Sequence, residues 1–216
     1  MQATSTWLDD VKKTSDYRNM ADYSTVDPSK LNKEQKLAYL VATKWMEKDK
    51  DSQLLMHLQG NLNCTSTTKL TKLKVTQYYL IYQGAGGTGK SVVCKTIAKH
   101  LIDKFPDEKH KFKILAPTGC AAYNVNGTTV HSGLQIPIKF SDDDPVHALS
   151  NDSLLRLQKD LEGVELIMID EKSMVSTTKL YQIDQRLREA RPEQADKPFG
   201  GISIILMVIL ILCNRK

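Results

Sequence analysis

The stretch Gly84-Ala85-Gly86-Gly87-Thr88-Gly89-Lys90-Ser91 fits the pattern G-x-x-x-x-G-K-[ST] at every fixed position. It follows a β-prone apolar run at residues 78–82 and precedes an amphipathic stretch at 91–105, so the expected setting is strand, loop and helix. Glycines let the backbone turn its N–H groups towards one anion, and the following helix adds its positive N-terminal end. The stretch therefore predicts a nucleotide-binding phosphate loop, whose expected backbone residues are Gly84, Gly86, Gly87, Thr88 and Gly89.

Side chains in two places carry the expected chemistry. Lys90 is expected to reach the β- and γ-phosphates, and the Ser91 hydroxyl is expected to bind Mg²⁺. The largely apolar run at 164–169 predicts a buried strand that ends at Asp170 and Glu171. Because ligands bind at the carboxyl ends of strands in open α/β sheets, we expect Asp170 to hold Mg²⁺, directly or through water. Glu171 is expected to polarise the attacking water, which favours a hydrolytic NTPase over a small-molecule kinase.

Apolar and amphipathic stretches alternate along the chain. Strands are predicted at 78–82, 111–116, 164–169 and 201–206, and helices at 33–48, 91–105, 120–125, 151–162 and 177–190. This alternation predicts an α/β fold, in which helices cover both faces of a mainly parallel sheet in three layers. Residues 1–30 are polar and predict an N-terminal extension, whereas the polar residues 49–76 predict a loop with a helical piece.

Composition is typical of a globular domain, with 41% hydrophobic and 25% charged residues. Four cysteines are scattered without a C-x-x-C pair, which predicts reduced intracellular thiols rather than disulfides or zinc: Cys64, Cys94, Cys120 and Cys213. Asp9 and Asp10 argue against a signal peptide. The longest apolar run, 202–213, is shorter than the roughly 20 residues of a membrane span, so a buried strand is expected there.

Lysines are concentrated around the phosphate loop. Ten lysines lie between Lys69 and Lys113, against only three acidic residues. Such an excess is typical of a surface that binds a polyanion and equally of a solvated helix face, so it favours neither interpretation.

Five segments occur in a characteristic order: LNKEQKLAY (31–39), GAGGTGKS (84–91), APTGCAAYNVNGTTVHS (116–132), LIMIDEKSMVS (166–176) and PFGGISIILM (198–207). Together they resemble the N-terminal RecA-type domain of PIF-type DNA helicases, a group that includes the helicase part of Helitron transposons. The third segment is the most specific, because generic phosphate-loop proteins do not carry it. The resemblance implies a RecA-like P-loop NTPase domain at 31–207. It also implies ATP hydrolysis coupled to 5′-to-3′ translocation and DNA unwinding, with roles in repair, recombination and telomere maintenance.

The resemblance also implies roles for single residues. Gln35 would contact the adenine edge, although Asn32 and Gln35 also fit a helix-capping box. Single-stranded DNA would lie along 118–131, where the expected contacts are Thr118, Gly119, Asn124, Thr128 and His131. Judged by residues alone, Thr118-Gly119 would be an ordinary turn and His131 a surface histidine. The expected ligands are ATP, Mg²⁺ and single-stranded and duplex DNA. We expect no membrane or obligate protein partner, and a location inside the cell, in the nucleus or in mitochondria.

Two departures from the family pattern lead to further expectations. Lys172 stands where an apolar residue is usual, and residues 208–216 replace the Gly-Asp-x-x-Gln-Leu-Pro-Pro segment expected after Met207. On this basis the domain is expected to be incomplete at its C-terminus, with an aberrant apolar tail and no second RecA-type domain, so this chain alone is expected not to unwind DNA. The alternatives are an inactive nucleotide- and DNA-binding module and an unrelated P-loop kinase.

Overall fold

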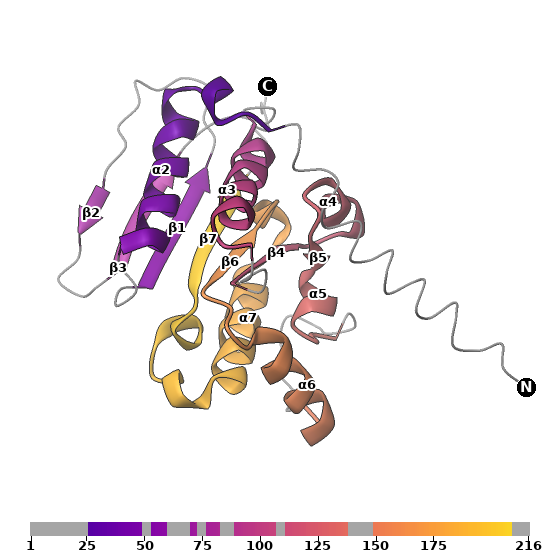
Figure 1. The fold of residues 1–216 in the computed structure, drawn as a ribbon. Helices are drawn as coiled ribbons and strands as arrows, with labels where there is room; N and C mark the ends of the chain where they lie inside the picture. Colours follow the sequence, from indigo (N-terminus) through magenta and orange to yellow (C-terminus); the bar gives the residue numbers. More distant parts are fainter. Residues whose placement is uncertain are drawn as a thin grey trace, which may run out of the picture.

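The strands form one sheet in a computed structural model, which describes residues 26–48, 53–59, 70–72, 77–82, 89–106, 111–137 and 149–208. Within these residues the strand order is β2-β3-β1-β7-β6-β4-β5 (Figure 1). The strands are β1 (Gln53–Gln59), β2 (Leu70–Lys72), β3 (Gln77–Tyr82), β4 (Phe112–Ala116), β5 (Thr128–Thr129), β6 (Leu166–Ile169) and β7 (Ser203–Val208).

Neighbouring strands are parallel throughout this sheet, except that β2 runs antiparallel to β3. The α/β class and the mainly parallel sheet are therefore confirmed. Because β1, β7, β6 and β4 point the same way, their C-terminal ends meet at one edge, which we call the carboxyl edge. Register places Leu115 of β4 opposite Ile169 of β6, so the residues that follow these two strands emerge side by side.

The α-helices of the described residues are α2 (Lys33–Lys48), α3 (Lys90–Lys104), α4 (Gly119–Asn124), α5 (Val130–Gly133), α6 (Asn151–Leu161) and α7 (Thr177–Ala190). Short 3₁₀ turns occur at η1 (Pro28–Lys30), η2 (Lys172–Met174), η3 (Pro192–Gln194) and η4 (Pro198–Gly201). Serine side chains begin two of the longer helices: the Ser150 hydroxyl accepts from Ser153 N, and that of Ser176 accepts from Lys179 N. Each satisfies an N–H group that the helix itself leaves without a partner.

Two hydrophobic cores lie on opposite faces of the sheet, as the side-chain alternation of strands requires. One core joins α2 and α3 to residues such as Leu54, Met168 and Ile205. The other joins α5, α6 and α7 to residues such as Ile167 and Ile204. The sheet is thus covered on both faces, which confirms the three predicted layers (Figure 1).

Helix positions agree closely with the sequence-based expectations, but the loop expected over 49–76 is wrong in part. This stretch contains β1 and β2, and Leu54, Leu55 and Met56 of β1 are buried. The apolar run of β1 is short and its flanks are polar, so its burial becomes evident only once β3 and β7 pair with it on either side. Residues 209–216, for which an aberrant apolar tail is expected, lie outside the described part of the chain.

No helix in the described part of the chain combines the length and the apolar character that crossing a bilayer requires.

Candidate nucleotide and DNA site

Ser91 and Asp170 meet at the carboxyl edge, where the first turn of α3 approaches the end of β6. The Ser91 hydroxyl donates to Asp170 Oδ2 at 2.8 Å, although the two residues lie 79 positions apart in the chain. Asp170 is 3% exposed, and its other oxygen, Oδ1, accepts from the N–H of Glu171 at 3.0 Å. The Asp170 N–H in turn donates to Leu115 O at 2.9 Å, which fixes the residue between β6 and β4. A hydroxyl and a carboxylate are thus paired next to a helix N-terminus.

Glu171 holds a left-handed backbone conformation, with φ 51° and ψ 40°. This conformation places Cβ close to the backbone and costs an L-residue other than glycine about 1 kcal/mol. It turns the chain sharply from β6 into η2, and the Glu171 side chain is half-buried. A strained glutamate directly after a buried strand is the kind of outlier that clusters at functional sites.

Gln35 lies against the start of α3. Its Oε1 accepts from Asn32 N at 2.9 Å, and Asn32 Oδ1 accepts from Gln35 N at 2.8 Å, so the predicted capping box is present. A Cβ added at Gly89 would come within 2.6 Å of Gln35 Nε2, and Gly89 has a φ of 76°. Glycine at 89 therefore allows both the turn into α3 and the close approach of the Gln35 carboxamide. The Gln35 side chain therefore caps the start of α2 and at the same time lies close to Gly89, the last glycine of the phosphate loop.

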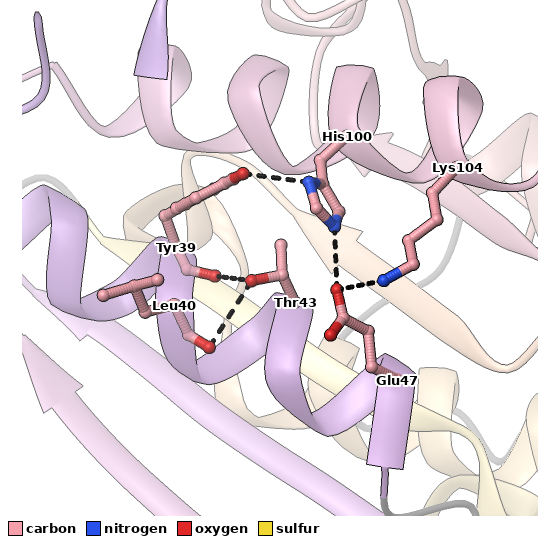
Figure 2. Close-up of polar contacts among 6 residues, drawn as sticks. All are labelled: Tyr39, Leu40, Thr43, Glu47, His100 and Lys104. Atoms are coloured by element: carbon pink, nitrogen blue, oxygen red, sulfur yellow. Dashed lines mark hydrogen bonds and ion pairs between the residues drawn. The ribbon is translucent and has the colours of Figure 1, made fainter. Parts of the chain in front are cut away.

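A polar cluster joins α2 to α3 (Figure 2). The Tyr39 hydroxyl and His100 Nδ1 are 2.9 Å apart, and Glu47 Oε1 lies 3.3 Å from His100 Nε2 and 2.5 Å from Lys104 Nζ. The Lys104 hydrogen bond lowers the pKa of the Glu47 carboxyl, and burial raises the pKa of Tyr39. Contacts at both ends of α2 thus hold it along α3. Sequence reasoning missed this cluster; its only signal was polar residues at positions 39, 43 and 47 of one helix face.

The phosphate loop is described only at its end. Gly89 is the N-cap of α3 and Lys90 is its first residue, as the strand–loop–helix prediction requires. The predicted residues Gly84, Gly86, Gly87 and Thr88 lie outside the described residues, as does the placement of the Lys90 side chain.

The five predicted DNA contacts lie together beside β4. Thr118 begins α4, and its Oγ1 accepts from Ala121 N at 3.2 Å, so the threonine is a helix cap whatever else it does. Gly119, Asn124 and Thr128 are exposed, and a Cβ at Gly119 would meet no atom within 4 Å. Thr128 belongs to β5, which pairs with the end of β4. The segment therefore presents an exposed polar surface that is separated from Asp170 by the single strand β4.

His131 lies in α5 and is half-buried. Burial lowers the pKa of His131 below its ordinary value of 6.5, and the positive charge of Lys179 on α7 adds to this effect. The imidazole is therefore neutral at physiological pH and carries no positive charge to this surface.

Several lysines of the predicted basic stretch are paired away from the carboxyl edge. Lys99 bonds Asp103 at 2.7 Å, Lys104 bonds Glu47, and Lys111 lies 3.7 Å from Glu165 and over the ring of Phe105. Because α3 begins at the carboxyl edge, Lys104 lies at its far end. For Lys99 and Lys104 the interpretation as a solvated face is the better one, whereas Lys111 is largely buried.

Within the described residues, no group of three or more His, Cys, Asp or Glu is arranged to hold a metal ion. Ser91 and Asp170 nevertheless suit Mg²⁺, because this hard cation takes oxygen ligands and commonly binds through one or two protein groups plus substrate phosphates and waters. The donor set fits a magnesium–nucleotide complex better than a dedicated metal cage.

Comparison with known proteins identifies relatives. A family model described as PIF1-like helicase matches residues 67–208, about two thirds of the chain. The ATP-dependent DNA helicase RRM3 of Saccharomyces cerevisiae is 36% identical over 129 residues, which are 59% of this chain and 17% of that protein. The ATP-dependent DNA helicase Pif1 of a Psychrobacter species is 34% identical over 124 residues, 57% of this chain and 18% of that protein. The chain thus spans less than a fifth of the length of these two relatives.

Solved structures of Pif1 helicases are also similar to this chain. The Bacteroides Pif1 helicase in complex with ADP-AlF3 and single-stranded DNA has a TM-score of 0.50 and 26% identity, and covers 83% of this chain and 32% of its own. A structure of two coordinating Pif1 helicases, described in terms of unwinding at forked double-stranded DNA, has a TM-score of 0.50 and 25% identity, with 83% and 33% covered.

Proposed function

Because the chain belongs to the PIF1-like helicase family, we propose that it binds ATP with Mg²⁺ at the carboxyl edge and forms the ATP-binding domain of an ATP-dependent DNA helicase. The observation that carries this proposal is the 2.8 Å hydrogen bond between Ser91 and Asp170. It brings the end of a phosphate-loop motif to the acidic residue that follows a buried apolar strand, and these are the two halves of an ATP site.

Each residue of the site has a role in this proposal. The backbone of Gly84, Gly86, Gly87, Thr88 and Gly89 surrounds the phosphates, Lys90 pairs with the β- and γ-phosphates, and Gln35 contacts the adenine. Ser91 and Asp170 hold Mg²⁺, which when bound offsets negative charge on the phosphates. Glu171 accepts a hydrogen bond from the attacking water and orients it towards the γ-phosphate. The turn at Glu171 carries its carboxylate beyond the end of β6, which supports this role.

The proposed DNA partner is single-stranded DNA, bound along Thr118, Gly119, Asn124, Thr128 and His131. Threonine hydroxyls and backbone N–H groups bond phosphates without reading sequence, which suits a protein that moves along DNA. The segment follows β4 and Asp170 follows β6, and the two strands are paired. The nucleotide site and the DNA surface are therefore joined through one strand pair, which supports a coupling between them during 5′-to-3′ movement. We place this activity inside the cell, in the nucleus or in mitochondria, and in DNA repair, recombination and telomere maintenance.

The Mg²⁺ dependence of ATP binding tests the proposal. Titration calorimetry of the 216-residue chain with ATP should show tighter binding with Mg²⁺ than with a chelator. Asp170→Asn keeps the shape of the side chain but removes its charge, so this variant should lose most of the Mg²⁺-dependent gain. Ser153→Ala, on the distant helix α6, is the control and should behave as the parent chain does. Equal affinities with and without Mg²⁺ in the parent chain would contradict the assignment.

A further inference from the structure

The strand that precedes the phosphate loop in the sequence is not the strand nearest to the rest of the site. The loop follows β3, yet β1 lies between β3 and β7 in the sheet. Neighbouring strands are about 4.8 Å apart, so β3 lies about 14 Å from β6 and β1 about 10 Å. Ser91, at the other end of the loop, is already bonded to Asp170 at the end of β6. A loop that curls around a phosphate has both of its ends close together, and β1 provides a start for the loop that is closer to Ser91 than β3 does.

The helix α3 packs against this nearer strand. Leu54 and Met56 of β1 belong to the core cluster that contains Val93 and Ile97 of α3. Both β1 side chains are buried, with Leu54 0% and Met56 2% exposed. Cys94 of α3 also contacts Met168 of β6, 3.9 Å from sulfur to sulfur. The helix that follows the phosphate loop therefore shares one core with β1, β7 and β6.

The chain leaves the carboxyl edge and returns to it at an adjacent point. It leaves at the end of β1, passes back along the sheet in β2, and returns in β3, which is parallel to β1. Leu58 and Tyr82 are paired across the two strands, so the ends of the intervening segment are neighbours. The segment between the end of β1 and the end of β3 can therefore be removed without moving β1 or β7.

The two strands also match in sequence at the offset that their pairing uses. QLLMHLQG begins at Gln53 and QYYLIYQG begins at Gln77, and both fit Q-x-x-x-x-x-Q-G. The register pairs Gln53 with Gln77, so strand partners are 24 positions apart along the whole ladder. A Gly follows the last Gln of each sequence match, at positions 60 and 84, so either match could lead directly into GAGGTGKS.

We propose that β1 is the strand that positions the phosphate loop, and that residues 60–83 are a dispensable insertion into this strand–loop–helix unit. The inference rests on the proposed ATP site. Removal of residues 60–83 joins Gln59 to Gly84 and leaves the strands β1-β7-β6-β4-β5, whose neighbours are all parallel. The one antiparallel pair of the described sheet, β2 with β3, lies inside the insertion.

A pair of deletions of equal length tests the proposal. One removes residues 60–83 and keeps β1; the other removes residues 53–76 and keeps β3, so that both place a Q-x-x-x-x-x-Q strand directly before Gly84. In the second variant Tyr78 must occupy the fully buried place of Leu54, according to the register. A larger ring with a hydroxyl group overpacks such a site. Thermal unfolding by circular dichroism and the affinity for a fluorescent ATP analogue are measured for both variants and for the full chain.

Deletion of 60–83 should leave the melting temperature unchanged or higher, with analogue affinity equal to or tighter than that of the full chain. Deletion of 53–76 should lower the melting temperature by about 5 °C or more and weaken binding. If the full chain binds the analogue but the 60–83 deletion is unfolded or does not bind it, the proposal is overturned. Equal melting temperatures and equal analogue affinities of the two deletion variants would also overturn it. If the full chain binds no analogue, the ATP site is wrong, and the two melting temperatures still decide whether β1 is the strand that the fold requires.

Discussion

At the scale of single residues, Glu171 connects function with strain. Its left-handed φ of 51° costs about 1 kcal/mol for a residue with a Cβ and almost nothing for glycine. Glu171→Gly should therefore raise the melting temperature by about 2–4 °C. Glu171→Ala is the matched control, since it removes the same carboxylate but keeps the Cβ. Thermal unfolding of the two variants compares the strain with the extra freedom of glycine in the unfolded chain. A lower melting temperature for the glycine variant than for the alanine variant would show that the strain is smaller than this freedom and would contradict the prediction.

His131 predicts a pH dependence of stability. Its pKa is lowered below 6.5 in the folded chain by burial and then by Lys179. The unfolded chain therefore takes up the proton first, so the stabilisation by neutral His131 is complete above the unfolded pKa and declines as pH falls through it. Between about pH 7.5 and about pH 5.5 the parent chain should lose more melting temperature than His131→Gln. Lys179→Ala should reduce that loss; no difference among the three proteins would refute the account.

The sequence predicted the position of single residues best where two separate motifs implied the same ligand. Ser91 and Asp170 were expected to share one ion, and they are hydrogen-bonded. The capping box of Asn32 and Gln35 was also anticipated and is present. His100 and Glu47 were not, because their interaction depends on how α2 lies along α3, which no local pattern specifies.

At the scale of elements, the cluster of Tyr39, His100 and Glu47 is expected to set the position of α2. Tyr39→Phe removes the 2.9 Å bond to His100 Nδ1, which is worth about 1 kcal/mol. Because Gln35 lies one turn before Tyr39, the variant should lose a few-fold in ATP affinity and discriminate less between ATP and GTP. GTP affinity should stay nearly constant. Tyr181→Phe, on an exposed part of α7, is the control. Unchanged nucleotide discrimination in Tyr39→Phe would show that the cluster is purely structural.

Helices were easier to anticipate than strands. The predicted helix 33–48 coincides with α2, because its apolar face and caps are local signals. In contrast, β1 was mistaken for part of a polar loop. Its burial depends on β3 and β7 on either side and on α2 and α3 above it. Strand order is likewise a property of the whole sheet, so the proximity of β1 to the site could not be inferred from the phosphate-loop motif.

At the scale of the whole molecule, the net charge of +5 and the surface beside β4 predict weak, salt-sensitive binding of single-stranded DNA. Counterion release gives a slope of about 0.7 per phosphate contact, so three contacts would weaken binding by about 20-fold between 50 and 200 mM salt. Fluorescence anisotropy with a labelled oligonucleotide measures this slope. Thr128→Glu places a negative charge on an exposed position of the surface and should weaken binding further. Ala195→Glu places the same charge on an exposed position before β7, at the opposite edge of the sheet, and should not. Absence of binding even at low salt would exclude the DNA surface.

The central claim is that the start of α3 and the end of β6 form one ATP site. Titration calorimetry of ATP with Mg²⁺ tests it most directly, on the parent chain, on Lys90→Ala and on Lys99→Ala. Lys99 lies on the same helix and pairs with Asp103, so its loss controls for charge alone. Loss of a charge-assisted phosphate contact predicts affinity about 10–100-fold weaker in Lys90→Ala, and nearly unchanged affinity in Lys99→Ala. Equal affinity of Lys90→Ala and the parent chain, or no ATP binding by the parent chain, would contradict the claim.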